Sequence, residues 1–449
     1  MENLQVPNLG ALWKIAYPLM LTALSGNLML FMDRILISKY DPLAMAAVAT
    51  IGMIFTMFQY GAVSITSIAG VFVGKYNGAL EHYKIGPVIW QMIWFSMFTV
   101  VIFVPIGLFC GTLFLPEQYH DLGTSYFKVI MIFGPLFPLI AALSSFYIGI
   151  GKVKLVTIST IIANMINIIL DVILIFGVEP YVPSMGTKGA AIATGVSMLL
   201  QAGLLFFFFL QEKYKISYKT NDHKFSLSIL KNCLNVGIPN ALGYFIELAA
   251  WAVLLQIMAY HSNGHIIILA TGQTIFLLLA FTTDGLQKSI IAITSNIIGA
   301  KKLELMPKVI KSALKLHIII VVCFSIPVIF CPQYIMHFFA NNNSESINNE
   351  ILLEYANTTC LLVLVYFIFD GLVWIFGGIL IAYLDTMFVM MMNTSSVWLA
   401  AVLPAYMAVN YLNCNANIIW QCMIFYAFIN ALGFYLRYYY KKDSSNIYN

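Results

Sequence analysis

Long apolar runs separated by short polar breaks fill this sequence from near its start to near its end. Each run has about 20 residues or more, the length that a helix needs to cross the hydrocarbon core of a bilayer. We expect twelve spans, at residues 9–38, 43–74, 86–115, 124–150, 155–178, 186–211, 228–259, 266–299, 308–339, 352–383, 387–411 and 416–440. The pattern predicts an all-α integral membrane protein.

The composition agrees with this class. Of the 449 residues, 61% are hydrophobic and 9% are charged, whereas soluble domains carry about 25% charged residues. The seven cysteines form no CxxC pair, so we expect neither a disulfide framework nor a zinc site. The start, MENLQVPNLG, lacks a basic region and a small-residue cleavage site, so we predict no signal peptide.

Lysine and arginine are distributed unequally between the two sets of loops. Most follow the second, fourth, sixth and eighth spans, and the opposite side keeps only Arg34, Lys39, Lys128 and Lys188. Because basic loops stay in the cytoplasm, we expect both termini there, in a multi-pass protein of the plasma membrane of a bacterium. The net charge of +4 lies in short loops, so nucleic acid is not an expected partner.

A polar segment in the middle divides the chain into two similar halves. We predict domains at 1–212 and 231–449, joined by a cytoplasmic linker at 213–230. Each half starts with a helix that has an early proline, Pro18 or Pro239, and continues to a helix ending at glycine, Gly74 or Gly299. The two prolines and the two glycines are separated by similar lengths of chain, which indicates a repeat related by an axis along the membrane normal.

The first span carries an acid inside its apolar run. Pro18, Thr22, Ser25, Met29 and Asp33 recur at steps of three or four residues and so share one helix face. An acid near the membrane centre costs about 3 kcal/mol, so we interpret this face as the wall of an internal cavity. The alternative is a helix-end acid at the outer surface that pairs with a neighbouring basic side chain.

The fifth span carries a second acid. Asn167 and Asp171 lie four residues apart on one face, with Asn164 one turn earlier. An amide next to a carboxylate can hold it by hydrogen bonding and change its proton affinity. Thr194 of the sixth span can add a hydroxyl. The alternative is that these groups only hold helices together.

The second half has its own acids, Glu247 after Pro239 in the seventh span and Asp370 in the tenth, where Tyr366 shares its face. Two acids on separate helices can share a proton or bind a dehydrated cation, or one of them can pair with a basic side chain. Opposite charges four residues apart, at Asp284 and Lys288, predict an intrahelical ion pair with a structural role, and the alternative is that the pair lines the cavity.

Two further patterns bear on function. The run of methionines at 387 and 390–392 suits an adaptable apolar surface for varied ligands, although plain packing is the commoner use. We find no HExxH, no phosphate-binding GxxxxGK[ST] and no GxSxG, and the histidines have no metal-ligand spacing. We therefore predict no enzyme activity and no cofactor.

In order and spacing, these motifs resemble the MATE family of multidrug and toxic compound extrusion transporters, with NorM-like features. They are Pro18 with Asp33, GKYNGA at 74–79, NIILD at 167–171, Glu247, YFIFD at 366–370 and LDT at 384–386. The resemblance covers essentially the whole chain. It departs in the eighth span, which reads FTTDGLQK where relatives have an apolar or proline-containing stretch, and in lacking the arginine found near the end of the tenth span.

The resemblance implies two six-helix lobes around a central cavity, and export of organic cations or amphipathic compounds in exchange for Na⁺ or H⁺. It implies that Asp33, Asn167 and Asp171, with Thr194 beside them, bind the coupling ion, while Glu247, Tyr366 and Asp370 serve Na⁺ or substrate. Na⁺ is then expected at Asp33 and Asp171 or at Glu247 and Asp370, and helix bending at Pro18 and Pro239. We expect a monomer. The alternatives are a lipid-linked precursor flippase, or an intramembrane enzyme or receptor without transport.

Overall fold

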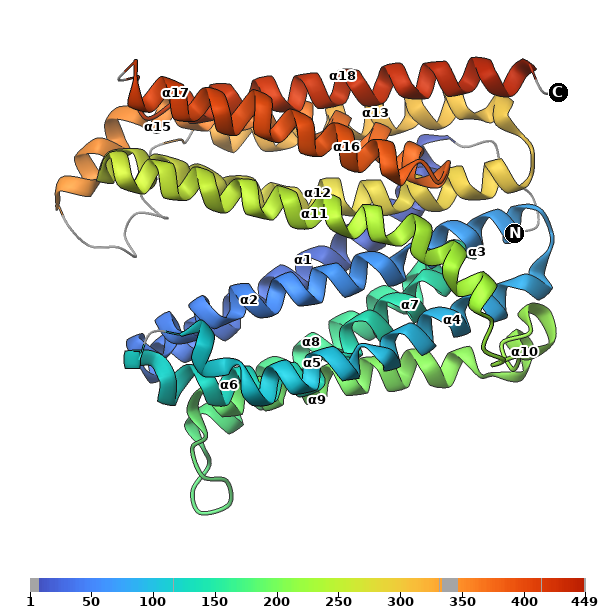
Figure 1. Ribbon diagram of the computed structural model, residues 1–449, viewed down its shortest axis with the longest axis horizontal. Helices are drawn as coiled ribbons and strands as arrows, with labels where there is room; N and C mark the ends of the chain where they lie inside the picture. Colours follow the sequence, from blue (N-terminus) through green and yellow to red (C-terminus); the bar gives the residue numbers. More distant parts are fainter. Residues whose placement is uncertain (1–7, 116, 331, 333–345, 413, 448–449) are drawn as a thin grey trace. The chain divides into compact units, whose positions relative to one another are not determined.

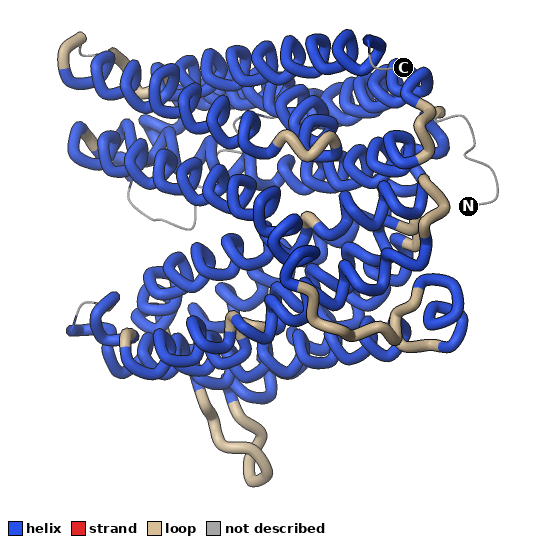
Figure 2. The backbone as a smooth tube through the Cα atoms, turned by 45° about the vertical axis from the view of Figure 1, so that its right-hand side comes forward, coloured by secondary structure: helices blue, strands red, loops and turns tan. Residues whose placement is uncertain are grey.

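Helices make up almost the whole molecule in the computed structural model, which describes residues 8–447 apart from 116, 331, 333–345 and 413 (Figures 1 and 2). No strand occurs in that part of the chain. The helices of eight residues or more are α1 Leu9–Tyr40, α2 Pro42–Ser67, α3 Ala69–Gly78, α4 Ile85–Phe98, α5 Val100–Phe109, α6 His120–Phe133, α7 Leu136–Gly149, α8 Val153–Phe176, α9 Gly186–Phe209, α11 Leu227–His261, α12 Asn263–Gly299, α13 Met306–Phe330, α15 Ser346–Ala382, α16 Thr386–Ser396, α17 Leu403–Asn410 and α18 Ile418–Ile447.

The predicted number of spans is confirmed. Twelve helical stretches of the described chain are long and apolar enough to cross a membrane. Several spans are built from two helices in sequence, such as α2 with α3 and α4 with α5. The eleventh contains a π-helical segment, Val397–Val402, between α16 and α17. Residues 333–339 of the ninth predicted span, and much of the loop after it, lie outside the described residues.

The chain packs into two compact units. Unit 1 contains Tyr17–Ala241 and Ala292–Leu303, and unit 2 contains Leu242–Ile291 and Glu304–Asn449 together with the start of α1 up to Ala16. Three α-helices, α1, α11 and α12, therefore pass from one unit to the other. Two of these passages lie beside a helix proline: α1 changes unit next to Pro18, and α11 changes unit two residues after Pro239. The domain boundaries predicted from the sequence stay a prediction.

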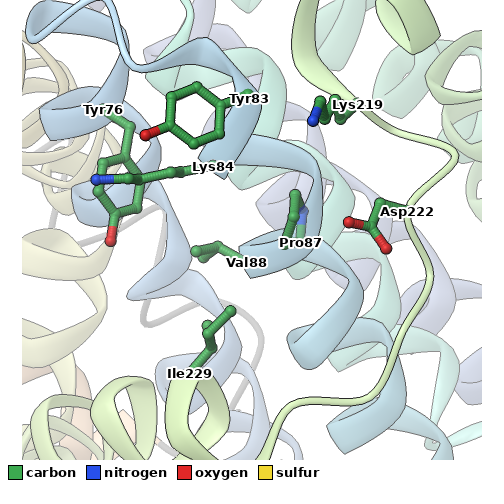
Figure 3. Close-up of a pocket in the computed structure, with 8 residues that line it drawn as sticks. All are labelled: Tyr76, Tyr83, Lys84, Pro87, Val88, Lys219, Asp222 and Ile229. Atoms are coloured by element: carbon green, nitrogen blue, oxygen red, sulfur yellow. The ribbon is translucent and has the colours of Figure 1, made fainter.

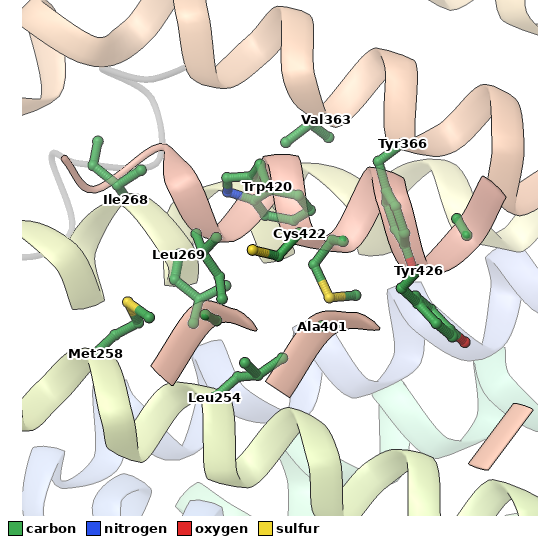
Figure 4. Close-up of a cluster of buried hydrophobic side chains, with 14 of the residues drawn as sticks. Leu254, Met258, Ile268, Leu269, Val363, Tyr366, Ala401, Trp420, Cys422 and Tyr426 are labelled. Atoms are coloured by element: carbon green, nitrogen blue, oxygen red, sulfur yellow. The ribbon is translucent and has the colours of Figure 1, made fainter. Parts of the chain in front are cut away.

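Aromatic and small apolar side chains form the core of unit 2 (Figure 4). Trp420 of α18 is fully buried there, and its ring lies 5.8 Å from that of Tyr366 of α15. The same packing buries Tyr426. α15 and α18 are thus held side by side, and this fixes the polar groups that they carry.

Four helices end with the same backbone conformation. The backbone is left-handed at Leu80, Gly151, Lys301 and Leu384, with φ of 61°, 78°, 55° and 64°. In each case the following N–H bonds the carbonyl five residues back, as from Glu81 to Tyr76 at 2.9 Å and from Lys302 to Ile297 at 3.1 Å. These are Schellman ends, which satisfy the last carbonyls of a helix. Leu80 and Lys301 are separated by the same length of chain as Pro18 and Pro239, and we call this separation the repeat spacing.

The repeat spacing corrects one expectation about the two halves. The predicted glycine end at Gly74 is wrong, because the helix continues through a further turn to Gly78, while α12 does end at Gly299. Pairing Gly74 with Gly299 thus compared positions one turn apart. With Gly78 opposite Gly299, the glycines, the prolines and the left-handed residues all follow the same repeat spacing.

A junction between α3 and the end of α12, inside unit 1, is organised by that repeat. A Cβ on Gly74 would lie 2.7 Å from the Cβ of Ser295, its partner at the repeat spacing. Gly78 abuts the backbone of Asn296, and Gly299 abuts the backbone of Lys75, so each of these contacts is the counterpart of the other. The two helix ends therefore meet across a local two-fold axis, and only glycine permits such a close approach.

The predicted linker at 213–230 is more ordered than its polar composition suggested. Its start forms a short helix, α10 Glu212–Tyr218, and its end is already part of α11. Between them the chain is bonded to α4. The indoles of Trp90 and Trp94 donate to the carbonyls of Thr220 and His223 at 2.8 and 3.0 Å, and Gln91 bonds the backbone of Lys224 and Ser226.

Candidate functional site

Thr22 and Ser25 of α1 share one face, as their spacing predicts, and this face lies against α8. That the face is the wall of an internal cavity stays a prediction. The hydroxyls of Thr22 and Thr157 both donate to the carbonyl of Pro18, at 2.9 and 2.8 Å. One turn further, the amide of Asn164 donates to the hydroxyl of Ser25 at 2.8 Å. A row of polar contacts therefore connects the two helices from the proline toward the acids.

At the end of this row the structure brings together all four residues predicted for the first half. With its nitrogen facing the two acids, the amide of Asn167 donates to Asp33 Oδ1 at 3.1 Å and to Asp171 Oδ2 at 3.2 Å. Its oxygen then accepts from the backbone N–H of Thr194 at 3.3 Å. The two carboxyl groups also hydrogen-bond each other. We call these four residues the carboxyl pair site.

The carboxyl pair site needs a positive counter-group. Asp171 and Asn167 are fully buried, and no described residue bonds Asp171 Oδ1. A hydrogen bond between two carboxyl groups requires a proton, and two carboxylates at this distance repel unless a cation lies between them. The geometry therefore suits a single proton, or a small cation between the carboxylate oxygens of the two acids.

The acids of the second half lie in a different arrangement, and no hydrogen bond joins Glu247 to Asp370 within the described residues. Glu247 Oε2 accepts from Asn393 Nδ2 at 2.9 Å. The oxygen of Asn393 in turn accepts from the hydroxyl of Tyr426 at 2.7 Å and from Asn430 Nδ2 at 2.8 Å. Asn393 thus connects α11, α16 and α18, and its amide is fixed by two donors. We call Glu247, Asn393, Tyr426 and Asn430 the amide network.

Asp370 is held separately, by the indole of Trp374 one turn along the same helix. Its carboxyl is buried, and its Oδ2 has no hydrogen-bond partner in the described chain. Tyr366 is buried with its ring 4.9 Å from that of Phe276. Tyr366 therefore packs in the core of unit 2, while Asp370 keeps one oxygen for a ligand.

Sequence reasoning missed several members of these sites. Asn393 belongs to a span for which only the methionine run was considered, and Tyr426 and Asn430 belong to the last span, for which no site residue was predicted. The signal available was the polar run NTSS at 393–396 inside an apolar span. Of the methionines, Met387 and Met391 are exposed, whereas Met390 and Met392 pack against Gly243 and Gly433. Tyr126 of α6 was also missed and lies within electrostatic range of Asp33 and Asp171.

The LDT motif forms an ion-pair cluster between two spans. Asp385 Oδ2 lies 2.9 Å from Arg437 Nε and 3.0 Å from Lys441 Nζ. Burial raises the pKa of Asp385, but the hydrogen bonds and charges of the two basic groups outweigh it and hold the pKa below its usual value. The arrangement ties the loop before α16 to α18.

A separate hollow of about 370 Å³ lies at the end of unit 1 that carries the linker (Figure 3). The charged residues that line it are Lys84, Lys219 and Asp222, and Tyr76 and Tyr83 stand beside them. Lys84 is already paired with Glu81 at 2.8 Å. In the described chain, no group of three or more His, Cys, Asp or Glu side chains is placed to hold a metal ion.

The decisive comparison is with a protein family. The model of the family described as MatE matches residues 18–173 and 239–407, which is most of the chain and includes the four acids Asp33, Asp171, Glu247 and Asp370. The chain belongs to the MatE family. The family resemblance found in the sequence, including its NorM-like character, is thereby confirmed.

Known MatE relatives agree with this assignment. The probable multidrug resistance protein NorM of Thermotoga maritima is 24% identical over 421 residues, covering 92% of this chain and 88% of that protein. The protein of the same name from Bacillus anthracis is 23% identical over 424 residues, covering 91% and 90%. The chain is thus a multi-pass membrane protein of a transporter family that handles small molecules.

Solved MatE structures have the same fold. A crystal structure of a MATE in complex with MaL6 superposes with a TM-score of 0.85 at 18% identity, covering 95% of this chain and 94% of that one. An outward-facing multidrug resistance MATE family transporter gives a TM-score of 0.84 at the same identity and coverage. The predicted fold class, twelve helices in two lobes, is confirmed.

Proposed function

We propose that this protein is a secondary antiporter that exports amphipathic organic cations in exchange for Na⁺ or H⁺. Direct contact between the carboxyl groups of Asp33 and Asp171 carries the proposal. Such a pair strongly requires a positive partner, which a small ion can supply. When no ion is bound, repulsion between the two carboxylates favours a rearrangement of the helices. Relatives named as multidrug resistance proteins supply the class of solute.

In the proposed cycle, the carboxyl pair site takes up one ion from outside the cell. Binding removes the repulsion between Asp33 and Asp171 and changes the hydrogen bonds that Asn167 donates to both acids. Because α1 is bonded to α8 through Pro18 and changes unit at that proline, the change can be passed to the helix as a bend. The bend lowers the affinity for the solute, which is the differential binding that coupling requires.

In the second half, we propose that Glu247 and Asp370 attract the cationic centre of the solute. Glu247 is oriented by Asn393, and Asp370 keeps an oxygen without a partner in the described chain. We further propose a monomer in the plasma membrane with both termini in the cytoplasm, on the basis of the lysine-rich loops. The solute and the exchanged ion are the small partners in this scheme, with no cofactor and no enzymatic step.

A lipid-linked precursor flippase is not favoured. A pyrophosphate headgroup needs buried basic side chains, whereas the charged members of both sites are the acids Asp33, Asp171, Glu247 and Asp370. The charge of the sites therefore matches a cationic solute.

Transport in membrane vesicles tests the proposal. Dye efflux is measured under separately imposed Na⁺ and H⁺ gradients for the wild type, Asp33→Asn and Asp171→Asn, with the exposed acid Glu304→Gln as a matched control. We expect one of the gradients to drive efflux in the wild type and the control, and neither gradient to do so in the two site variants. Full efflux in both site variants would remove the carboxyl pair site from coupling.

A further inference from the structure

The hollow of unit 1 lies at the level where membrane spans begin and end (Figure 3). Tyr76 lies in the last turn of the second span, Tyr83 stands at the start of the third, and Ile229 lies in the first turn of the seventh. All three ends belong to the lysine-rich side, which we propose faces the cytoplasm. The hollow is therefore at the depth of the lipid headgroups on that side.

Two opposite charges line the hollow without a partner. Lys219 and Asp222 belong to one turn of the linker, in which the N–H of Asp222 donates to the carbonyl of Lys219 at 3.0 Å. Within the described chain, neither the ammonium nor the carboxylate takes part in an ion pair. The ammonium of Lys219 lies 5.7 Å from the centre of the Tyr83 ring. The hollow thus keeps one free positive and one free negative group.

Neighbouring opposite charges elsewhere in the chain do bond each other. Lys84, which also lines the hollow, bonds Glu81 at 2.8 Å and so adds no net charge. On α12, Lys288 Nζ is 2.7 Å from Asp284 Oδ2, which confirms the predicted ion pair. The two linker charges face one hollow from the same turn and stay apart. This arrangement suits a ligand that carries the two complementary charges.

The backbone that carries the two charges is held against α4. Gly86, in the first turn of α4, abuts the carbonyl of Lys219 and leaves no room for a side chain there. The indole of Trp90, one turn further, donates to the carbonyl of Thr220 at 2.8 Å. The charged turn is therefore ordered before any ligand binds, which lowers the entropy cost of binding.

We propose that the hollow binds a phosphoethanolamine headgroup, and that a phospholipid of the adjacent leaflet supplies it. The phosphate accepts hydrogen bonds from the ammonium of Lys219, and the primary ammonium of the headgroup donates to the carboxylate of Asp222. A volume of about 370 Å³ is sufficient for such a group. This lipid site goes beyond the proposed antiport and does not depend on it.

The two charges distinguish between headgroups. A phosphatidylglycerol headgroup has only the negative charge, so Asp222 would stay unpaired beside a phosphate. Phosphatidylcholine has a quaternary ammonium without N–H groups, so Asp222 would receive no hydrogen bond. A lipid is favoured over soluble phosphoethanolamine by the depth of the hollow and by exposed apolar side chains next to it in the chain. Leu227 is 67% exposed and Phe225 is 51% exposed, and acyl chains can cover both.

Lipid titration of the purified full chain tests the site. Its unfolding temperature in detergent micelles is measured against added dioleoyl phosphatidylethanolamine, phosphatidylcholine or phosphatidylglycerol, or soluble phosphoethanolamine, because a ligand of the folded state raises this temperature by mass action. About 0.3 M salt screens the exposed lysines of the linker. The site variants are Lys219→Gln and Asp222→Asn. Lys215→Gln changes an exposed lysine one turn before Lys219 and is the matched control.

We expect the wild type and the control to bind phosphatidylethanolamine about tenfold more tightly than the other two lipids, the equivalent of one charge-assisted hydrogen bond. Lys219→Gln should lose this preference. Asp222→Asn should reverse it in favour of phosphatidylglycerol, because the lysine keeps its charge while the carboxylate is lost.

Equal binding of the three lipids by the wild type would overturn the site, as would a preference for phosphatidylethanolamine that both site variants retain. Soluble phosphoethanolamine that binds as tightly as the lipid would overturn the lipid as the source. If Lys219→Gln does not fold, Asp222→Asn decides alone, because a hollow without a ligand predicts no reversal of preference. Ion-driven efflux is measured separately, so the proposed function stands or fails on its own assay.

Discussion

The acids of the first half touch each other, whereas those of the second half are each held by a neutral donor. Asp33 and Asp171 share a hydrogen bond and a common amide, Asn167. Glu247 is bonded to Asn393, and Asp370 to Trp374. One half thus places two negative charges where only one can be kept, and the other distributes its charges over separate donors.

This difference suggests a division of labour. A pair in direct contact responds strongly to the gain or loss of a single positive charge, because the alternative is repulsion in a buried site. Acids with donors of their own stay oriented whether or not an ion is present, and they can face a larger cation. We therefore assign coupling to the carboxyl pair site and solute attraction to the second half.

The strongest expected effect comes from neutralising one member of the touching pair. Asp171→Asn should lower gradient-driven efflux about 100-fold. This factor corresponds to a coupling free energy in the upper part of the range found between two sites. Binding of the solute to purified protein should change much less, because the solute site lies elsewhere. A dye-binding titration set beside the vesicle assay separates the two, and an equal loss of binding and transport would argue against the assignment.

A smaller effect is expected at the shared amide. Asn167→Ala removes the donor to both acids but leaves their charges, so we expect about a tenfold loss of coupled efflux. Asn164→Ala, one turn away on the same face of α8, removes only a bond to Ser25 and serves as the control. Similar losses in both variants would show that helix packing, and not the carboxyl pair, is what matters.

At the amide network the expected change is in affinity. Asn393→Leu leaves Glu247 without its donor and Tyr426 without its acceptor. We expect KM for a cationic dye to rise about fivefold, the equivalent of one ordinary hydrogen bond, with the response to the ion gradient retained. An altered ion response with unchanged KM would reverse the division of labour between the two halves.

The smallest effect on transport is expected at Asp385, which belongs to neither site. Asp385→Asn should reduce the stability of the purified protein by about 2 kcal/mol at neutral pH, because it breaks two charge-assisted bonds. Since the folded protein lowers the pKa of Asp385, the stabilisation is present above the ordinary carboxyl pKa and is lost as the pH falls through the lowered value. Thermal unfolding at a series of pH values checks this: the wild type and the variant should converge in acid, and a constant difference would contradict it.

Periodicity in the sequence predicted much of the carboxyl pair site. Steps of three and four residues put Thr22, Ser25 and Asp33 on one face of a helix, and Asn167 with Asp171 on one face of another, so a single contact between the two helices aligned both sets. The amide network could not be found in this way. Asn393 and Asn430 lie in separate spans, and the pattern along one helix does not state which other helix it will face.

The helix ends show a different limit. Glycine was used as the sign of a helix end, but Gly74 is needed for the close approach of Ser295 and not for a turn. The true end one turn later has its left-handed residue at Leu80, where no glycine marks it. The repeat spacing between the two halves was the better guide.

Counting the ions displaced by the solute tests the central claim most directly. Purified protein is titrated with a cationic dye while released protons are followed in weakly buffered solution and released Na⁺ with an ion-selective electrode. If the carboxyl pair site exchanges its ion for solute, dye binding should release either protons or Na⁺ from the wild type and from Asp385→Asn. Asp171→Asn should bind the dye without releasing an ion. Equal ion release from Asp171→Asn and the wild type would contradict the account.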